Sequence, residues 1–463
     1  MDQTLEILRR ATEGTHYDHR LHLVGGLVRD RVLGKQLDED IDIVIEGDAG
    51  ELAQFLHEQG IADHPPVTYP RFGTAMLTVN GRQVELVGAR KESYEPDSRK
   101  PSTVPGTLLE DVLRRDFTIN TLLQNLHTDK ILDLTGKAMQ DIRDGIIRTP
   151  VDPIITFDDD PLRMLRAVRL AVRLGFVIHP DTYAALRDRA ARLSIVSGER
   201  IREEFVKIVT GPNAGEGLEQ LRETSLLDQF APELAAMHGV SQNVYHIHDV
   251  WTHTIRTLES IPAQAGMILR LAALTHDVGK VPARSVDENG EVHFYGHQTV
   301  GAEIARRIMR RLRFSNSQTD AVKFLISMHL RVGEYDNQWS DAAVRRLLRD
   351  AGGRLDQLVT LTRADKAASN PEMPAADLEV FGEHVARIKK ELAGKRIASP
   401  LNGREIIELL GLAPGPEIGA IKAYLEGQII EGNLLPGDKA AASELVLRKY
   451  GRTSVEIDRS GHS

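Results

Sequence analysis

Two aspartates, Asp40 and Asp42, lie two positions apart where the alternating apolar segment Ile41, Ile43 and Ile45 begins. Residues two apart in an extended strand point to the same face, so the carboxylates would share one face and the isoleucines the other. Such carboxylates repel unless a cation lies between them, and Mg²⁺ prefers carboxylate and phosphate oxygens. The pair predicts a Mg²⁺ site that aligns a hydroxyl with a triphosphate for in-line displacement. A solvated acidic strand start is the simpler alternative.

A glycine pair, Gly25 and Gly26, precedes these aspartates between a strand segment and a helical run. A strand, a glycine turn and a helix start present backbone N–H groups to a phosphate, and Arg29 lies nearby as a second anion partner. A tight turn without a ligand is the alternative, because the spacing fits no dinucleotide or Walker fingerprint. The aspartates downstream favour phosphate binding. Glu85, in RQVELV, is a candidate third catalytic carboxylate, or simply an exposed strand residue.

The middle of the chain carries a second set of imidazoles and carboxylates on predicted helices. Its members are His253, His276, Asp277 and Asp365, with His297 and His329 as additional candidates. These ligand types suit a divalent transition metal such as Ni²⁺, Co²⁺ or Mn²⁺, with positions open for water. An isolated His–Asp pair is more often a surface hydrogen bond, so the metal interpretation depends on the fuller set.

The composition limits the remaining chemistry. The chain has no cysteine, which excludes disulfides, thiolate metal sites and a cysteine nucleophile. Its formal net charge is -9, so a surface that binds a polyanion must be local. The start, MDQTLEILRR, lacks the apolar core of a signal peptide, and no apolar stretch reaches the roughly 18 residues that cross a bilayer. We therefore expect a cytoplasmic protein with no membrane contact. The sequence indicates no stable protein partner.

The elements that must position these residues change type along the chain. A length of 463 residues exceeds a single core, which stops growing near roughly 250 to 300 residues. Residues 1 to 150 mix strand and helix signals, and TAMLTV and RQVELV flank Asn80-Gly81 as in a hairpin. From Asp159 the periodicity is helical almost to the C-terminus. The pattern predicts an α+β fold: a head with a mixed sheet and helices, followed by mostly α-helical parts.

Gly, Pro and Ser clusters place soft boundaries near positions 150, 235 and 375. The predicted parts are a head over 1–150, a helical neck over 151–235, a metal-binding body over 236–375 and a helical tail over 376–463. Within the head, residues 94–107 are rich in Pro, Ser and charge and show no periodicity, which predicts a mobile loop.

Five motifs in succession resemble those of the class II tRNA nucleotidyltransferases, the CCA-adding enzymes of the DNA polymerase β superfamily. They are LVGGLVRD (23–30), DEDIDIVIEG (38–47), LEDVLRRDFTIN (109–120), DDDPLRMLRAVRLAVRLGF (158–176) and ERIREEF (199–205). Residues 399–434 also resemble the family's bacterial tail, which implies that the predicted tail over 376–463 binds RNA. The resemblance implies a polymerase-β-like head that adds CCA to the 3′ end of tRNA from CTP and ATP without a nucleic-acid template.

The resemblance also assigns roles to residues. Gly25, Gly26 and Arg29 would hold the triphosphate, and Asp40 and Asp42 the Mg²⁺. The implied nucleotide site consists of Arg115, Asp116, Asn120, Asp160, Arg163 and Arg166. Asp160 and Arg163 can pair with the amino donor and ring acceptor that adenine and cytosine share, so that side chains replace a template. Glu199, Arg200 and Glu204 would brace the nucleotide helix. A solvated helix face is the alternative for the arginines.

The central set of histidines and aspartates resembles the HD-superfamily phosphohydrolases. This implies removal of a 2′,3′-cyclic or terminal phosphate from tRNA, with an inactive RNA-binding body as the alternative. Family members that add only CC lack a flexible loop between the aspartates and RRD, so residues 94–107 favour full CCA addition or A addition to CC ends. A poly(A) polymerase is a further alternative. The arginine runs 306–314 and 345–349 would contact tRNA phosphates, or be ordinary solvated faces.

Overall fold

The computed structural model describes residues 2–35, 40–95, 98–336, 338–373, 376–392 and 395–451, with side chains outside 92–102. The chain divides into two compact units. The first comprises Met1–His238, Pro262–Arg270 and Ile304–Thr319, and the second Gly239–Ile261, Leu271–Glu303 and Asp320–Ser463. The division after His238 lies close to the boundary expected near 235, and the four-part scheme stays a prediction. Across the described ranges, no helix has both the length and the apolar character to cross a bilayer.

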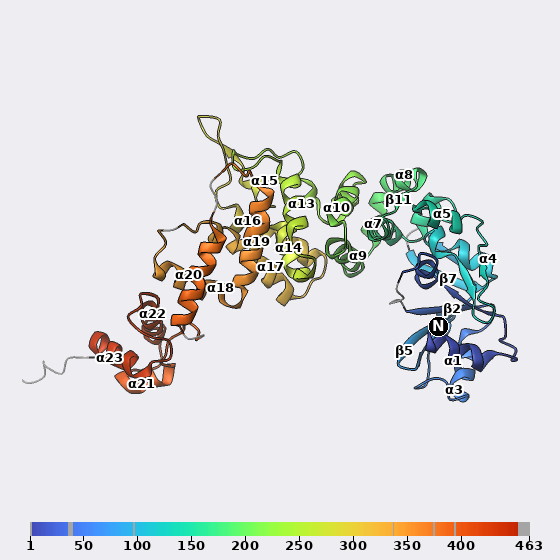
Figure 1. Cartoon of the computed structure of the whole chain (residues 1–463), viewed down its shortest axis with the longest axis horizontal. Helices are drawn as coiled ribbons and strands as arrows, with labels where there is room; N and C mark the ends of the chain where they lie inside the picture. The colour runs from blue at the N-terminus through green and yellow to red at the C-terminus, as the bar shows by residue number, and fades with distance from the viewer. Residues whose placement is uncertain are drawn as a thin grey trace, which may run out of the picture. The chain divides into compact units, whose positions relative to one another are not determined.

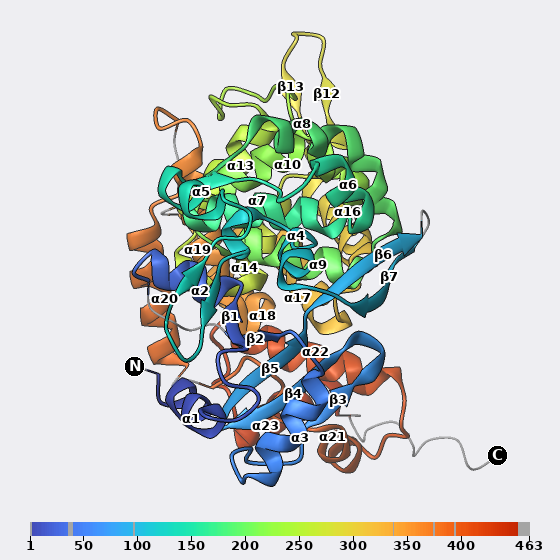
Figure 2. The same cartoon turned by 90° about the vertical axis from the view of Figure 1, so that its right-hand side faces the viewer.

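A seven-stranded mixed sheet organises the N-terminal part, in the order β3-β4-β5-β2-β1-β8-β9 (Figures 1 and 2). The strands are β1 (Leu21–Val24), β2 (Ile41–Ile45), β3 (Val67–Tyr69), β4 (Thr74–Val79), β5 (Arg82–Gly88), β8 (Leu123–Asn125) and β9 (Ile131–Leu132). Strand β2 runs parallel to β5 and antiparallel to β1. The expected hairpin at Asn80-Gly81 is confirmed, since β4 and β5 pair across it and both residues have positive φ.

The helices of this part cover the sheet and bring later motifs to it. They are α1 (Gln3–Thr12), α2 (Gly26–Val32), α3 (Ala49–Glu58), α4 (Leu108–Leu113) and α5 (Ala138–Asp144), with a 3₁₀ turn η2 (Thr118–Asn120). Helix α3 contacts β4 and β5 and buries Leu52, Ala53 and Leu56. The isoleucines of β2 are buried on one sheet face, as the alternation predicts.

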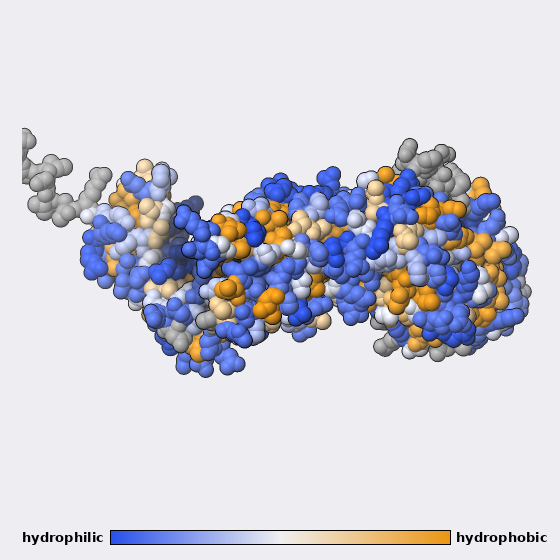
Figure 3. Space-filling view, turned by 90° about the horizontal axis from the view of Figure 1, so that it is seen from above, coloured by the Kyte–Doolittle hydropathy of each residue, from blue (hydrophilic) through white to orange (hydrophobic). Residues whose placement is uncertain are grey.

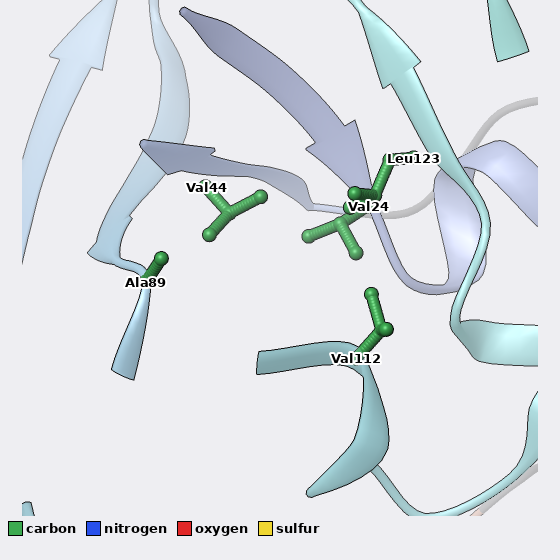
Figure 4. Close-up of a cluster of buried hydrophobic side chains, with 5 residues drawn as sticks. All are labelled: Val24, Val44, Ala89, Val112 and Leu123. Atoms are coloured by element: carbon green, nitrogen blue, oxygen red, sulfur yellow. The ribbon is translucent and has the colours of Figure 1, made fainter. Parts of the chain in front are cut away.

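A small apolar cluster ties helix α4 to the sheet. Its members come from β1, β2, α4, β8 and the residue that follows β5: Val24, Val44, Ala89, Val112 and Leu123 (Figure 4). Fully burying a side chain as large as valine or leucine contributes about 1.5–3 kcal/mol. Helix α4 begins with a capping box in which Thr107 and Glu110 bond each other's backbone N–H groups. The RRD segment that follows α4 is thereby fixed near the end of the glycine-turn strand.

The segment expected to be a mobile loop, 94–107, consists largely of strand residues in its described part. Strands β6 (Arg90–Glu95) and β7 (Ser98–Pro105) pair antiparallel in a two-stranded ribbon (Figure 2). The sequence of this segment is rich in Pro, Ser and charged residues and does not alternate between apolar and polar types, so no strand is predicted from it.

The neck region is helical. It comprises α6 (Pro153–Asp159), α7 (Leu162–Leu174), α8 (Pro180–Arg189), α9 (Gly198–Thr210), α10 (Ala214–Glu223), α11 (Leu226–Phe230) and α12 (Pro232–Ala235), with a short parallel pair, β10 (Ile146–Ile147) and β11 (Val177–Ile178). Helix α7 packs on α9 and α10 and buries Met164, Leu165 and Val168, while Arg163, Arg166 and Arg169 stay half-buried. The amphipathic pattern of α7 therefore presents cations along one side.

The rest of the chain is also mostly helical (Figure 1). The helices are α13 (Val250–Ser260), α14 (Gly266–Thr275), α15 (Lys280–Ala283), α16 (His297–Arg311), α17 (Asn316–Gly333), α18 (Asp341–Ala351), α19 (Leu355–Ala368), α20 (Leu378–Glu391), α21 (Gly403–Leu410), α22 (Pro416–Ile430) and α23 (Lys439–Tyr450), and β12 (Ser285–Val286) pairs with β13 (Val292–His293). On the face drawn in Figure 3, apolar residues form separate patches between hydrophilic ones. The expected α+β class, with a mixed-sheet head before helical parts, is confirmed.

Candidate active sites

The carboxylate of Asp42 lies beside the glycine turn. Gly25 precedes α2 with a φ of 78°, a conformation that favours glycine. A Cβ atom built on Gly25 would lie 3.5 Å from Asp42 Oδ2, so the turn passes directly over the carboxylate. Strand β1 is the immediate neighbour of β2, which explains how residues far apart in sequence meet here.

Two of the three predicted catalytic carboxylates lie on neighbouring strands, and the third directly precedes one of them. Asp42 is the register partner of Glu85 on the parallel strand β5, so the two side chains share a sheet face. Both are half-buried, and the exposed Asp40 directly precedes β2. In the described parts of the chain the ligand atoms of the three do not all lie within 4.8 Å of one another. Asp42 and its neighbours offer the oxygen ligands that Mg²⁺ binds, and phosphate oxygens would complete the shell.

The guanidinium of Arg29 is enclosed by protein groups. Its side chain is 2% exposed, Nε donates to Asp30 Oδ1 at 2.7 Å, and Nη1 donates to Asn120 Oδ1 at 2.8 Å. The resemblance implies that Arg29 holds the triphosphate. Its burial and these contacts favour an indirect role, in which Arg29 positions Asn120 and the helix behind the glycine turn.

Asn120 continues this network to the helix that carries the predicted base-reading residues. Asn120 Nδ2 donates to Asp116 Oδ1 at 3.0 Å, and Arg166 donates to Asp116 Oδ2 through Nε at 2.9 Å and Nη2 at 2.6 Å. Burial alone would raise the pKa of Asp116, but the charge of Arg166 and the hydrogen bonds from Asn120 and Arg166 hold it well below its ordinary value. Asp116 is therefore an ionised link between η2 and α7.

A second contact joins α7 to the same segment. Arg163 Nη2 donates to the backbone carbonyl of Arg114 at 2.7 Å. Arg115, predicted to contact the nucleotide, donates through Nη2 to Asp111 Oδ2 at 2.7 Å. Asp111 is fully buried and also accepts hydrogen bonds from Arg114. The sequence interpretation missed Asp111, although its spacing of three and four from the two arginines is a helical ion-pair signal.

Asp160 lies at the entry to α7, where its Oδ1 accepts a hydrogen bond from Leu162 N at 3.1 Å. The structure thus places Asp160 and Arg163 one turn apart.

The neck motif, predicted to brace the nucleotide helix, contacts that helix through Glu204 of α9. Glu204 Oε2 accepts a hydrogen bond from Arg169 Nε at 2.5 Å. Glu199 Oε1 lies 4.0 Å from Arg313 Nε, so this carboxylate faces the segment after α16.

The second set of predicted ligands converges from five helical segments into two adjoining triads. The first triad is His253, His276 and Asp365, and the second is Asp277, His297 and His329; within each, the ligand atoms lie within 4.8 Å of one another. Asp277 joins the triads. Its Oδ2 lies 3.4 Å from His253 Nε2 and 3.2 Å from His276 Nε2, while its Oδ1 lies 3.4 Å from His297 Nε2.

The four imidazoles of these triads have the same orientation. Each Nδ1 lies within hydrogen-bond distance of a backbone carbonyl, at 3.3 Å for His253, 2.8 Å for His276, 2.8 Å for His297 and 2.7 Å for His329. If Nδ1 donates, Nε2 presents a lone pair to the centre, which is the arrangement of metal-binding histidines. The Nε2 atoms of His253 and His276 are buried and have no hydrogen-bond partner among the described residues. Lone pairs and carboxylates that converge in this way fit a divalent cation.

The charges at this centre are tightly balanced. Burial would raise the pKa of Asp277, but His276 and Lys280 lower it well below its ordinary value. Burial would lower the pKa of His276, yet Asp277 and Asp365 raise it. A proton on His276 or a metal ion therefore compensates the carboxylates. Lys280 Nζ lies 2.7 Å from Asp277 Oδ2, a contact that the sequence interpretation did not assign although Lys280 follows one turn after Asp277.

Two neighbouring features hold this centre together. A Cβ atom on Gly279 would clash with the carbonyl oxygen of His297 and would lie 2.5 Å from Gly301 N, so only glycine allows α16 to begin here. His246 Nε2 lies 3.1 Å from Lys280 Nζ. Burial and the charge of Lys280 lower the pKa of His246 to about 3, so it is neutral and can accept from the lysine. Asp249 caps α13 by accepting a hydrogen bond from Thr252 N.

The arginine runs predicted as tRNA contacts differ in their surroundings. In the run 345–349, Arg345 pairs with Glu391 at 2.8 Å, Arg346 with Glu431 at 3.3 Å and Arg349 with Asp350 at 2.8 Å. These pairs favour the alternative of a structural, solvated face for that run. On α16, Arg307 and Arg310 are exposed, which keeps them as candidates for phosphate contacts.

Comparison with known proteins matches the regions of the chain that contain both candidate sites. Three family models match: the Poly A polymerase head domain over residues 21–148, the probable RNA and SrmB-binding site of polymerase A over 175–237, and the HD domain over 246–369. A CC-adding tRNA nucleotidyltransferase of Thermus thermophilus is 34% identical over 453 residues, covering 95% of both chains. An A-adding tRNA nucleotidyltransferase of Deinococcus radiodurans is 31% identical over 330 residues, and the match covers 69% of this chain and 74% of the relative's chain.

Solved structures show the same fold. A Bacillus stearothermophilus CCA-adding enzyme in complex with CTP matches with a TM-score of 0.68 and 22% identity, covering 97% of this chain and 98% of its own. A Thermotoga maritima CCA-adding enzyme complexed with tRNA matches with a TM-score of 0.60 and 21% identity, covering 97% of this chain and 96% of its own. Head and HD domains both imply dependence on divalent metal ions. With a relative matched over nearly its whole length, the chain belongs to the CCA-adding tRNA nucleotidyltransferases and is a member that carries an HD domain.

Proposed function

We propose that the head adds the complete CCA sequence to the 3′ end of tRNA, using CTP and ATP with Mg²⁺. The observation that carries this proposal is the position of Asp42, which faces the glycine turn and lies beside Glu85 in register. When bound, Mg²⁺ supplies charge neutralisation for the triphosphate and for the attacking 3′ hydroxyl. Asp40 and Asp42 would hold it, with Glu85 as an additional carboxylate.

The selection of C and A is assigned to Asp160 and Arg163 at the start of α7. Cytosine and adenine each present an amino donor beside a ring acceptor, which one carboxylate and one guanidinium can pair with. Their placement depends on the contacts of α7 with the RRD segment, made by Arg166 on Asp116 and by Arg163 on the Arg114 carbonyl. Side chains held in this way replace a template.

Three substrates separate the possible nucleotide specificities. They are tRNA without CCA, tRNA ending in C and tRNA ending in CC, each incubated with CTP alone, ATP alone and both. Addition of C and then A supports the proposal. Addition of C alone would identify a CC-adding enzyme, the second candidate, which the Thermus thermophilus relative favours. Addition of A only to CC ends would identify an A-adding enzyme, and repeated A addition without C incorporation a poly(A) polymerase.

We infer that the HD centre is a metal-dependent phosphohydrolase that removes a 2′,3′-cyclic or terminal phosphate from RNA. The supporting observation is the convergence of four imidazole Nε2 atoms on the carboxylates of Asp277 and Asp365. The two triads could hold two ions with Asp277 between them, and Ni²⁺, Co²⁺ or Mn²⁺ suit these ligands. A divalent ion supplies Lewis-acid activation of water and phosphate when bound. Water adds across one P–O bond, and its second hydrogen passes to the departing oxygen. A cyclic phosphate thereby gives a phosphomonoester and a free hydroxyl, and a terminal phosphate gives inorganic phosphate and a free hydroxyl.

Hydrolysis of 2′,3′-cyclic AMP with each of the three metals tests this activity. The Asp277→Asn variant should be inactive, because it removes a carboxylate of the second triad that also lies 3.4 Å from His253 Nε2 and 3.2 Å from His276 Nε2 of the first. Asp42→Asn should retain full hydrolysis, since Asp42 belongs to the first unit and the HD centre to the second. A wild-type protein that hydrolyses no cyclic phosphate with any of the metals would leave this part of the chain as an RNA-binding body.

A further inference from the structure

The HD centre opens into two cavities that meet at one ligand. A cavity of about 290 Å³ is lined by Asp277, His297, His329 and Asp365, and a groove of about 720 Å³ also reaches Asp365. Tyr245 and His246 line both and so form the wall between them. The side chain of Asp365 is 24% exposed, which makes it the ligand accessible from the groove. The reacting phosphate can therefore be approached from two sides.

The larger groove carries an excess of positive charge. Arg256, Arg363 and Lys366 line it and are exposed, while Asp365 is its one acidic lining residue among the described positions. Neither Arg256 nor Arg363 is ion-paired with a described carboxylate, and Lys366 Nζ donates only to the carbonyl of Ala376, at 3.2 Å. The formal net charge of the chain is -9. Even so, the side chains of Arg256, Arg363 and Lys366 lie in one groove beside the predicted metal ligand Asp365, and none of the three is paired with a described carboxylate. Such a groove fits a polyanion.

The smaller cavity has aromatic walls. Tyr295 is 78% exposed and stacks on His293 with ring centroids 5.2 Å apart and planes 11° apart. Tyr245, which separates the cavities, is 51% exposed. Exposed aromatic rings of this kind stack nucleobases without selecting their sequence. Lys280 supplies a cation at the back of this cavity.

We propose that the HD centre acts on the 3′ end of a single-stranded RNA chain and binds the phosphodiester backbone that precedes the end in the groove of Arg256, Arg363 and Lys366. The terminal base stacks on the aromatic walls of the smaller cavity, and the terminal phosphate lies at Asp277 and Asp365. This inference rests on the proposed phosphohydrolase activity and adds to it the substrate class: an oligonucleotide end is preferred over a mononucleotide, because only the oligonucleotide has phosphates that reach the groove.

The first test compares two substrates of the full chain: 2′,3′-cyclic AMP, and an RNA trinucleotide that ends in a 2′,3′-cyclic phosphate. The wild-type KM should be at least about fivefold lower for the trinucleotide, as expected for one or two exposed charge contacts. Equal KM values for the two substrates would overturn the inference and leave the phosphohydrolase activity established.

The second test removes charge from the groove. The double variant R363A/K366A should raise the KM for the trinucleotide to near that for the cyclic mononucleotide and leave the latter unchanged. The slope of log KM for the trinucleotide against log salt concentration should fall by about 1.4, because each phosphate contact of a single strand contributes about 0.7 and the variant removes two. The matched control is K389A/K390A, which removes two exposed lysines of α20 that do not line the groove. A trinucleotide preference that survives in R363A/K366A would overturn the inference.

The third test does not depend on activity. A fluorescent RNA trinucleotide with a 3′-phosphate is titrated against the full chain in the presence of EDTA, and its anisotropy is measured. Weaker binding by R363A/K366A than by wild type and K389A/K390A supports the groove as an RNA site, even if no hydrolysis is found and the proposed activity fails. Identical binding by all three proteins would reject it.

Discussion

The guanidinium of Arg166 donates two hydrogen bonds to one carboxylate oxygen of Asp116, through Nε at 2.9 Å and Nη2 at 2.6 Å. These residues lie 50 positions apart, Asp116 after α4 and Arg166 on α7. Their ion pair fixes the helix that carries the predicted base-reading residues to the segment between α4 and β8. Through Asn120 and Arg29 the same network reaches the helix behind the glycine turn.

Arg166→Met should loosen this connection. Removing one partner of a buried ion pair typically costs about 3–5 kcal/mol, and because the Arg166 side chain is 37% exposed we expect a smaller loss, roughly 2–3 kcal/mol. The measurement is hydrogen–deuterium exchange of the amides of residues 108–120. Arg143→Met, an exposed arginine on α5, is the control. If Asp116→Asn and Arg166→Met destabilised additively in the double variant, the pair would not be coupled.

The contribution of Asp116 should depend on pH. Its pKa is lowered in the folded state, so the stability that it adds is complete above the unfolded value of about 3.9 and is lost as the pH falls toward the folded value. The exchange protection that separates wild type from Asp116→Asn should therefore be full near neutral pH and shrink below about pH 4. A difference that persists unchanged in acid would show that the carboxylate charge is not its source.

Asp42→Asn should abolish nucleotide addition while leaving the hydrolysis of cyclic phosphate intact. Loss of residues that merely orient metal ligands costs about 10–100-fold, so loss of a ligand itself should exceed about 100-fold. Incorporation of labelled CTP and ATP into tRNA measures the effect. His276→Ala provides the reciprocal control, with addition preserved and hydrolysis lost. A variant that impaired both reactions equally would indicate that the substitution disturbs folding of the whole chain.

Metal content should reveal the two triads of the HD centre separately. After incubation with Mn²⁺ or Ni²⁺ and desalting, elemental analysis of the wild type should find two tightly held ions per chain, since each triad supplies three ligands. His253→Ala and His329→Ala should each lose one ion, and Asp277→Asn should lose both. His238→Ala, an exposed histidine outside these ligand groups, should retain both. Loss of one ion or none from Asp277→Asn would contradict a shared carboxylate.

Binding of tRNA should weaken with salt through only one of the two arginine runs. Removing the exposed Arg307 and Arg310 should reduce the slope of log affinity against log salt by about 0.7–0.9 for each phosphate that these arginines bind. Removing Arg346 and Arg349, which are paired with Glu431 and Asp350, should leave the slope unchanged. Filter binding over a range of KCl concentrations measures both. A slope that changed only in the second variant would reverse the assignment.

Local patterns in the sequence were sufficient for much of the head's secondary structure. The alternation around Ile41, Ile43 and Ile45 and the Asn80-Gly81 turn predicted strands and a hairpin that the structure contains. These signals are reliable because apolar and polar side chains alternate with a period of two residues in a strand that has one buried face. The ribbon of β6 and β7 gave no such signal, because its sequence is rich in Pro, Ser and charged residues and does not alternate between apolar and polar types.

The chemical types of the site residues, and their grouping into two sites, were determined by the sequence itself: carboxylates after a glycine turn, and histidines with aspartates on helices. Only the tertiary structure decided which atoms meet. It enclosed Arg29 against Asn120, 91 positions away, and it placed Asp277 between two triads drawn from segments as distant as His253 and Asp365. Periodicity reports the surroundings of residues within a few turns of one another, whereas these contacts depend on how separate helices and strands pack, which no local repeat records.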